Sequence, residues 1–185
     1  MPVYISLLRG VNVGGHNKIK MEELRLLYES LGLSSAQTHI QSGNIVFKAK
    51  ERSEDQLTKR ICAGVEKRFG FRPAIVLRTT PELRKVVAKN PFVDRKGIDP
   101  SKLLVTFLSS EPLPAERRKL LTLKIEPEEL RLDGRELFIY FPNGIARSKF
   151  SWSSVEKILR VSGTARNWNT VQKLLAMAIA LESGK

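Results

Sequence analysis

The order of short apolar segments in the first ninety residues constrains the fold most strongly. Residues 3–8 and 74–77 are apolar enough to form buried strands, and residues 37–48 have the pattern of a β-hairpin. Residues 21–31 and 53–70 repeat apolar side chains at helical spacing, and a glycine follows or ends each segment. The resulting order is strand, helix, two strands, helix, strand. This order is typical of a split β-α-β, or ferredoxin-like, unit.

A similar order of elements begins again after residue 101, at an offset of roughly 90–100 residues. The predicted elements are a strand at 103–108, a helix at 114–123, a hairpin around Asp133-Gly134, a short helix opened by a capping box at 153–156, and a final helix capped by Asn167 or Asn169. The residue identities do not repeat, so only the architecture is expected to. We predict an α/β (α+β) protein with two ferredoxin-like α/β-plait units, at 1–90 and 102–185. The span 91–101 is the linker, and an additional C-terminal helix closes the second unit.

The composition and charge of the chain limit the classes of protein to which it can belong. The chain has 185 residues, of which 42% are hydrophobic, and no apolar run is long enough to span a bilayer. The net charge is +13, which allows a polyanionic partner, but only 7% of residues are aromatic and none is interleaved with a basic run. Cys62 is the single cysteine, so no internal disulfide can form. The N-terminus has the pattern of a strand and not of a signal peptide, so we expect a cytoplasmic location.

A polar, glycine-rich stretch at residues 9–20 follows the first predicted strand. A strand that leads through such a loop into a helix is the topology of many phosphate-binding sites. Its glycines allow a close approach of the backbone to a ligand, and its amides and cations supply hydrogen-bond donors. The spacing matches neither the P-loop nor the dinucleotide-binding pattern. The alternative is a long turn whose lysines lie in solvent.

Three further stretches could contribute to the same site. The turn at 42–44 could be only a hairpin tip, and Lys149 could lie in a solvent-exposed connection. Residues 164–170 precede the last helix, where free N–H groups and the helix dipole favour an anion. We therefore expect Arg166 to bind a ligand from an exposed position, although it could instead tie the helix to the core. Trp168 could stack on a planar ligand, but it more commonly packs the helix onto the core.

Patterns for other chemistries are missing from the sequence. It contains two histidines and one cysteine without metal-ligand spacing, so we predict neither a metal site nor a cofactor. No nucleophile signature is present. His16 is the only candidate for proton transfer, and without a visible orienting carboxylate a structural role is favoured. Whether the protein is an enzyme stays open.

The motifs resemble a bacterial family known as domain of unknown function 1697. The resemblance is carried by residues 4–21, with Arg9-Gly-Val-Asn-Val-Gly-Gly-His-Asn at their centre, by 41–47, by Ser148-Lys149, and by 164–170. It covers nearly the whole chain. It implies two ferredoxin-like units and no particular activity.

These observations lead to one main hypothesis, in which the protein binds a small anionic or nucleotide-like ligand in one cleft. The alternatives are a basic module that binds nucleic acid, and a scaffold whose polar motifs are structural. The oligomeric state cannot be predicted. The residues expected to form the cleft are Arg9, Asn12, Gly14, Gly15, His16, Asn17, Lys18, Ser42, Asn44, Lys149, Arg166 and Asn167.

Overall fold

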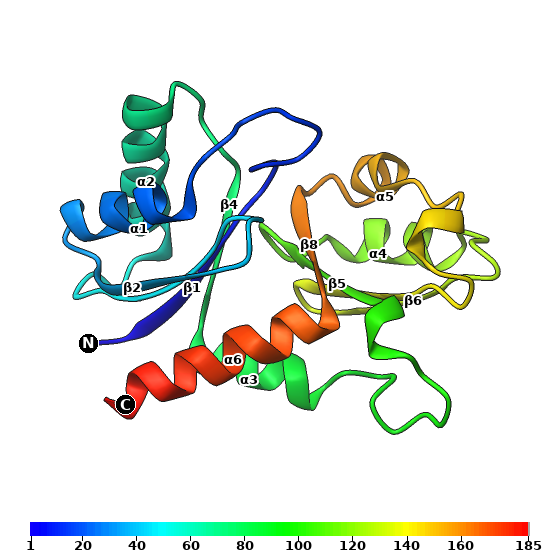
Figure 1. Ribbon diagram of the computed structural model, residues 1–185. Helices are drawn as coiled ribbons and strands as arrows, with labels where there is room; N and C mark the ends of the chain where they lie inside the picture. Colours follow the sequence, from blue (N-terminus) through cyan, green and yellow to red (C-terminus); the bar gives the residue numbers. More distant parts are fainter. Residues whose placement is uncertain (185) are drawn as a thin grey trace. The chain divides into compact units, whose positions relative to one another are not determined.

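The computed structural model describes residues 1–184, and the chain divides into two compact units by its internal contacts (Figure 1). Unit 1 contains Met1–Lys85 and the segment from Lys173 onward, and unit 2 is Val86–Gln172. The predicted boundaries place the whole final helix with the second unit, whereas its residues from Lys173 cluster with unit 1.

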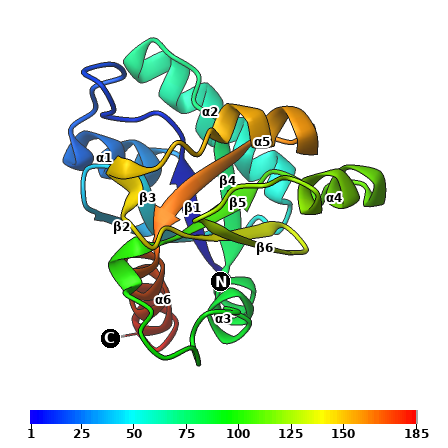
Figure 2. The ribbon, with the colours of Figure 1, turned by 90° about the vertical axis from the view of Figure 1, so that its right-hand side faces the viewer.

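Unit 1 has a four-stranded antiparallel sheet in the order β2-β3-β1-β4. Helices α1 and α2 pack against each other and cover one face of this sheet (Figures 1 and 2). This is the arrangement of a split β-α-β unit. Its elements are β1 (Val3–Leu8), α1 (Met21–Ser30), β2 (Ser34–His39), β3 (Asn44–Lys48), α2 (Glu54–Phe69) and β4 (Ile75–Thr79), followed by α3 (Thr80–Ala88), which runs past the unit boundary.

The core of unit 1 explains why these segments fold in this way. Along β1, Tyr4 and Leu8 point toward the helices and pack with apolar residues of α1 and α2 such as Leu24 and Leu57. The predicted capping of α2 is confirmed. Ser53 Oγ accepts a hydrogen bond from the Gln56 N–H at 3.3 Å. Together these features fix the sheet against which the β1–α1 loop is positioned.

Unit 2 repeats the architecture, with strand order β6-β7-β5-β8 and α4 packed against α5 on one face of the sheet (Figure 2). The predicted mixed α/β fold is thus confirmed. The elements are η1 (Pro100–Lys102), β5 (Leu103–Leu108), α4 (Pro114–Leu121), β6 (Glu129–Asp133), β7 (Glu136–Tyr140), η2 (Ile145–Arg147), α5 (Trp152–Leu159) and β8 (Gly163–Asn167), followed by α6 (Trp168–Glu182), which runs past the unit boundary.

Two local predictions in unit 2 were wrong. Residues 163–167 form β8, an edge strand paired with β5, and not a polar loop before the last helix. The cap of α5 is Ser151, whose Oγ accepts from the Ser154 N–H at 3.4 Å, and not Ser153. In both cases the polar residues lie near the start of a helix, as the sequence pattern predicted, but their backbone conformation differs from the prediction. Residues 164–167 are in a strand, and Ser153 lies inside α5.

The strand registers reveal one residue identity that does repeat. Ile5 of β1 lies opposite Arg78 of β4, and Val105 of β5 lies opposite Arg166 of β8. Each arginine is the next-to-last residue of its strand and is followed by a helix. Arg78 is only 1% exposed and Arg166 only 7%. A buried arginine therefore occupies the same structural position in both units.

None of the helices within residues 1–184 is long and apolar enough to cross a bilayer. Cys62 is buried in α2, where its Sγ lies 3.4 Å from the Pro73 carbonyl oxygen, and burial raises the pKa of its thiol.

Candidate functional site

The loop between β1 and α1 is built around a tight turn. The His16 N–H donates to the Val13 carbonyl at 3.1 Å, and between them Gly14 and Gly15 have φ angles of 59° and 80°. A two-residue turn with both φ angles positive is the type that strongly favours glycine. All four residues are exposed. The turn therefore presents the tip of the loop to solvent.

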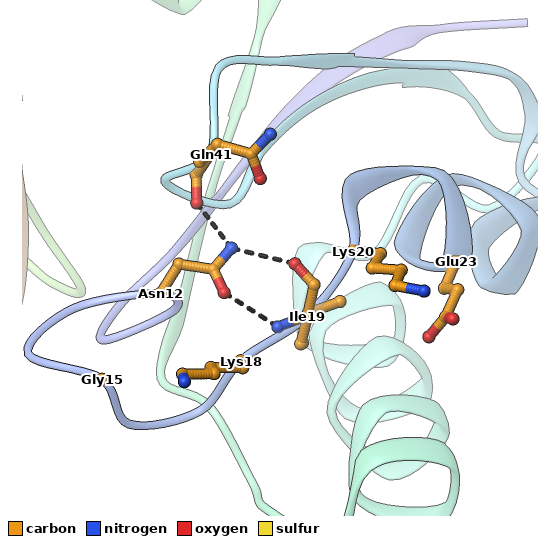
Figure 3. Close-up of a pocket in the computed structure, with 7 residues that line it drawn as sticks. All are labelled: Asn12, Gly15, Lys18, Ile19, Lys20, Glu23 and Gln41. Atoms are coloured by element: carbon orange, nitrogen blue, oxygen red, sulfur yellow. Dashed lines mark hydrogen bonds between the residues drawn. The ribbon is translucent and has the colours of Figure 1, made fainter.

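Asn12 braces this loop against the rest of unit 1. Its Nδ2 donates to the carbonyl oxygens of Ile19 at 2.9 Å and Gln41 at 2.8 Å, and its Oδ1 accepts from the Ile19 N–H at 2.8 Å (Figure 3). The φ angle of Asn12 is 56°, a left-handed conformation that asparagine tolerates better than most residues. Since both ends of the amide already have protein partners, Asn12 positions the loop and the turn at Gln41.

Asn17 also has a structural role. Its Nδ2 donates to the Gly10 carbonyl at 3.1 Å, and its own carbonyl accepts from the Asn12 N–H at 3.2 Å. Together with the bonds of Asn12, these contacts close the neck of the loop. The sequence suggested the Asn12 and Asn17 side chains as donors to a ligand, but their hydrogen bonds hold the loop in shape.

The turn at 42–44 lies at the end of the β2–β3 hairpin. Asn44 is fully buried, and its Nδ2 donates to the His39 carbonyl at 3.1 Å and to Ser42 Oγ at 2.8 Å. A Cβ added to Gly43 would lie only 2.9 Å from Leu8 Cβ, so this turn packs tightly against β1. Ser42 and Asn44 thus fix the hairpin tip, which corresponds to the hairpin alternative considered for this segment.

A cavity of about 560 Å³ opens between the loop, the start of α1 and the hairpin turn (Figure 3). Lys18 and Lys20 are exposed at its wall and form no ion pair with any described residue. The residues that line the cavity are Asn12, Gly15, Lys18, Ile19, Lys20, Glu23 and Gln41. Of these, Ile19, Glu23 and Gln41 were missed as site residues, whereas Lys20 is one of the cations of the 9–20 stretch that the sequence predicted to supply charge.

The start of α1 adds a partial positive charge to the same wall. Lys20 precedes the helix in an extended conformation and its side chain makes no capping hydrogen bond. The first N–H groups of an uncapped helix are free donors, and the helix dipole makes this end attractive to anions. Two acidic residues of the first turn, Glu22 and Glu23, offset part of this charge.

Arg9 begins the loop, and His16 lies at its tip. The Arg9 N–H donates to the Ala74 carbonyl at 2.8 Å, and its side chain is half-buried. His16 is exposed at the tip, where its side chain makes no hydrogen bond or ion pair within residues 1–184. It therefore lacks an orienting carboxylate there, the feature that usually accompanies a catalytic histidine.

The remaining predicted residues belong to unit 2, and their convergence with the loop stays a prediction. Lys149 is exposed beside a separate cavity of about 240 Å³ between the α4–β6 connection and the start of α5. Asn167 ends β8, where its Oδ1 accepts from the Asn169 N–H at 3.0 Å and its Nδ2 donates to the Ser101 carbonyl at 2.7 Å. Asn167 is thus the N-cap of α6, and it is one of the two residues that were predicted for this role.

Arg166 does not occupy the exposed helix start that we expected. It lies within β8, where its guanidinium donates to Thr164 Oγ1 at 2.7 Å and to the Ala165 carbonyl at 2.8 Å. Burial lowers the pKa of Arg166 to about 10, so it is still charged at neutral pH. The strand pairing with β5 turns this side chain into the protein and not toward solvent.

The comparison with known proteins agrees with the resemblance in the sequence. The profile of the family described as protein of unknown function (DUF1697) matches residues 1–138. The chain belongs to this family. A solved structure, that of a conserved bacterial protein from Streptococcus pneumoniae, is 24% identical, with a TM-score of 0.71 over 96% of this chain and 98% of that one. None of the curated proteins matches.

The residues matched by the DUF1697 profile include all of the cavity but only part of the predicted cleft. All seven cavity residues lie within residues 1–138, whereas Lys149, Arg166 and Asn167 lie beyond them. No cluster of three or more potential metal ligands occurs in the part of the chain that the structure describes. The chemistry available at the cavity is therefore that of lysine, carboxylate, amide and backbone N–H groups.

Proposed function

We propose that the protein binds a small anionic or nucleotide-like ligand in the cavity of unit 1. The observation that carries the proposal is a pair of lysines, Lys18 and Lys20, that line this cavity without an ion-pair partner among the described residues. A volume of about 560 Å³ lies within the range of pockets that enclose small organic ligands. Two unpaired ammonium groups on such a wall favour a phosphate or carboxylate.

The length of the loop supports a role beyond folding. In unit 2 the equivalent connection, from β5 to α4, needs only five residues, 109–113. In unit 1 the connection from β1 to α1 takes twelve, 9–20. Since both units build the same sheet order, the extra length is not required by the architecture. Long loops held on a rigid scaffold commonly carry binding residues.

Backbone groups supply further donors. The N–H groups of Gly14 and Gly15 donate to no acceptor within residues 1–184, and both glycines are exposed. Consecutive free N–H groups in a glycine turn can hold an anion, as can the uncapped start of α1. The ligand therefore meets donors from the loop and from the helix. His16 stays the candidate for proton transfer if the ligand reacts.

The test is a calorimetric titration of the purified protein with pyrophosphate and with AMP. Replacing both cavity lysines (Lys18→Gln and Lys20→Gln) should weaken binding at least about tenfold, because each replacement removes a charged hydrogen-bond donor. The matched control replaces two exposed lysines of α2 (Lys59→Gln and Lys67→Gln), with the same change in net charge. Equal affinities for the two double variants would overturn the proposal.

The salt dependence separates this proposal from nucleic-acid binding, which the net charge of +13 allows. A protein that contacts six or more phosphates loses about 10³-fold or more in affinity over a fourfold increase in salt. We expect DNA and RNA to bind weakly, without selectivity, and to be released at physiological salt. Selective RNA binding that survives at that salt would favour the nucleic-acid alternative.

A further inference from the structure

The wall of the cavity is not uniformly cationic. Glu23 lines it, half-buried, one turn along α1 from Lys20. The nearby guanidinium of Arg25 pairs with the two flanking acids, with Glu22 at 2.6 Å and with Glu29 at 2.6 Å. Glu23 itself forms no ion pair or hydrogen bond within residues 1–184. Its carboxylate is therefore available to a ligand as an acceptor.

A carboxylate in this place restricts what the cavity can hold. Two like charges at close range repel each other near a protein surface, where the effective dielectric constant is well below that of water. An anion therefore avoids the wall formed by Glu23. A neutral group with O–H or N–H donors is attracted there, in the way that an acidic residue holds ribose hydroxyls in dinucleotide-binding folds.

The cavity separates these two kinds of contact in space. Figure 3 shows the Lys18 ammonium on the side of the glycine turn, and the Glu23 carboxylate on the side of α1 together with the Lys20 side chain, with Ile19 between the two sides. Gln41 faces the same space from the hairpin turn, and its side-chain amide makes no hydrogen bond to a described residue. An inorganic phosphate held at Lys18 would make no use of Glu23 or Gln41, which line the rest of the cavity.

Resting on the proposed function, we infer that the ligand is a hydroxylated phosphomonoester, with its phosphate at Lys18 and its hydroxyl groups at Glu23 and Gln41. Sugar phosphates and nucleoside monophosphates share this chemistry. Ile19 supplies an apolar contact to the body of either ligand. The inference predicts discrimination against inorganic phosphate, which lacks the hydroxylated body.

The experiment is a titration with three probes, which are inorganic phosphate, ribose 5-phosphate and AMP. Both phosphomonoesters should bind the wild type at least about tenfold tighter than inorganic phosphate. The substitution Glu23→Ala should weaken both phosphomonoesters about tenfold and leave inorganic phosphate unchanged or tighter, because it removes an acceptor and a repulsive charge. Asp55→Ala, at an exposed acid in the first turn of α2, is the control and should change none of the three.

The outcomes separate the inference from the proposed function. Binding of none of the three probes contradicts both. Binding of all three with similar affinity, with Glu23→Ala strengthening all of them, overturns the inference and leaves anion binding by the lysines intact. Tighter binding of AMP than of ribose 5-phosphate assigns the nucleoside as the source of the ligand, and equal binding assigns the sugar phosphate.

Discussion

Removal of the Asn12 side chain should release the loop that forms the cavity. Asn12→Ala removes three hydrogen bonds, two donated to the carbonyls of Ile19 and Gln41 and one accepted from the Ile19 N–H. At about 1 kcal/mol each the loss is about 3 kcal/mol, and water around the half-buried side chain reduces it to roughly 2 kcal/mol. Alanine at a φ of 56° adds about 1 kcal/mol of backbone strain.

A second substitution separates the two contributions. Asn12→Gly loses the same hydrogen bonds but adopts a positive φ without strain, so its loss should be about 2 kcal/mol, below the roughly 3 kcal/mol of alanine. The assays are urea denaturation and hydrogen exchange of the Ile19 amide, whose N–H donates to Asn12. Both variants should also bind AMP more weakly, since the cavity depends on the position of the loop.

If Asn12→Gly unfolds within about 0.5 kcal/mol of the wild type, and the Ile19 amide exchanges at the wild-type rate, the hydrogen bonds do not hold the loop. Asn12 would then be available to a ligand, as the sequence alone suggested.

Two further substitutions test the packing. Gly43→Ala should lower the free energy of unfolding by about 2–4 kcal/mol, since the added Cβ meets Leu8 Cβ at 2.9 Å and the φ angle is 70°. The control Gly15→Ala, with open space around it and a φ of 80°, should lower it by only about 1 kcal/mol in the same denaturation assay. Equal losses of stability in the two variants would contradict the close packing of the hairpin turn. Arg166→Gln should cost about 3 kcal/mol, because buried acceptors lose a charged donor, whereas the exposed Arg118→Gln should stay within about 0.5 kcal/mol. A loss at Arg166 as small as that at Arg118, measured by thermal unfolding, would return Arg166 to the set of ligand candidates.

The fold was largely predictable because periodicity and capping act locally. The strands at Val3–Leu8 and Leu103–Leu108 were predicted with their observed bounds, because a largely apolar stretch of that length is typical of a buried strand. The strand Gly163–Asn167 was missed because it contains no large apolar residue and lies at a sheet edge. Completing the architectural repeat would have identified it, since Ile75–Thr79 occupies the equivalent place in unit 1.

The candidate site was predictable only in part. The glycine turn and Lys18 follow from the sequence, since positive φ angles require glycine there and lysine stays exposed. The sequence does not predict the direction in which the Asn12 side-chain amide points, because its hydrogen-bond partners are Ile19 and Gln41, and Gln41 is distant in sequence. Glu23 was missed because a first-turn acid on a helix is common and only the cavity distinguishes it.

The division of the chain has a consequence for how the protein is made on the ribosome. The residues of unit 1 are interrupted by all of unit 2, and the last part of unit 1 is the segment of α6 from Lys173 onward, which buries Leu174, Ala178 and Leu181. Unit 1 is translated first but completed last, while the sequence of unit 2 is continuous. The nascent unit 1 therefore keeps part of its apolar surface uncovered until the segment from Lys173 onward has been synthesised.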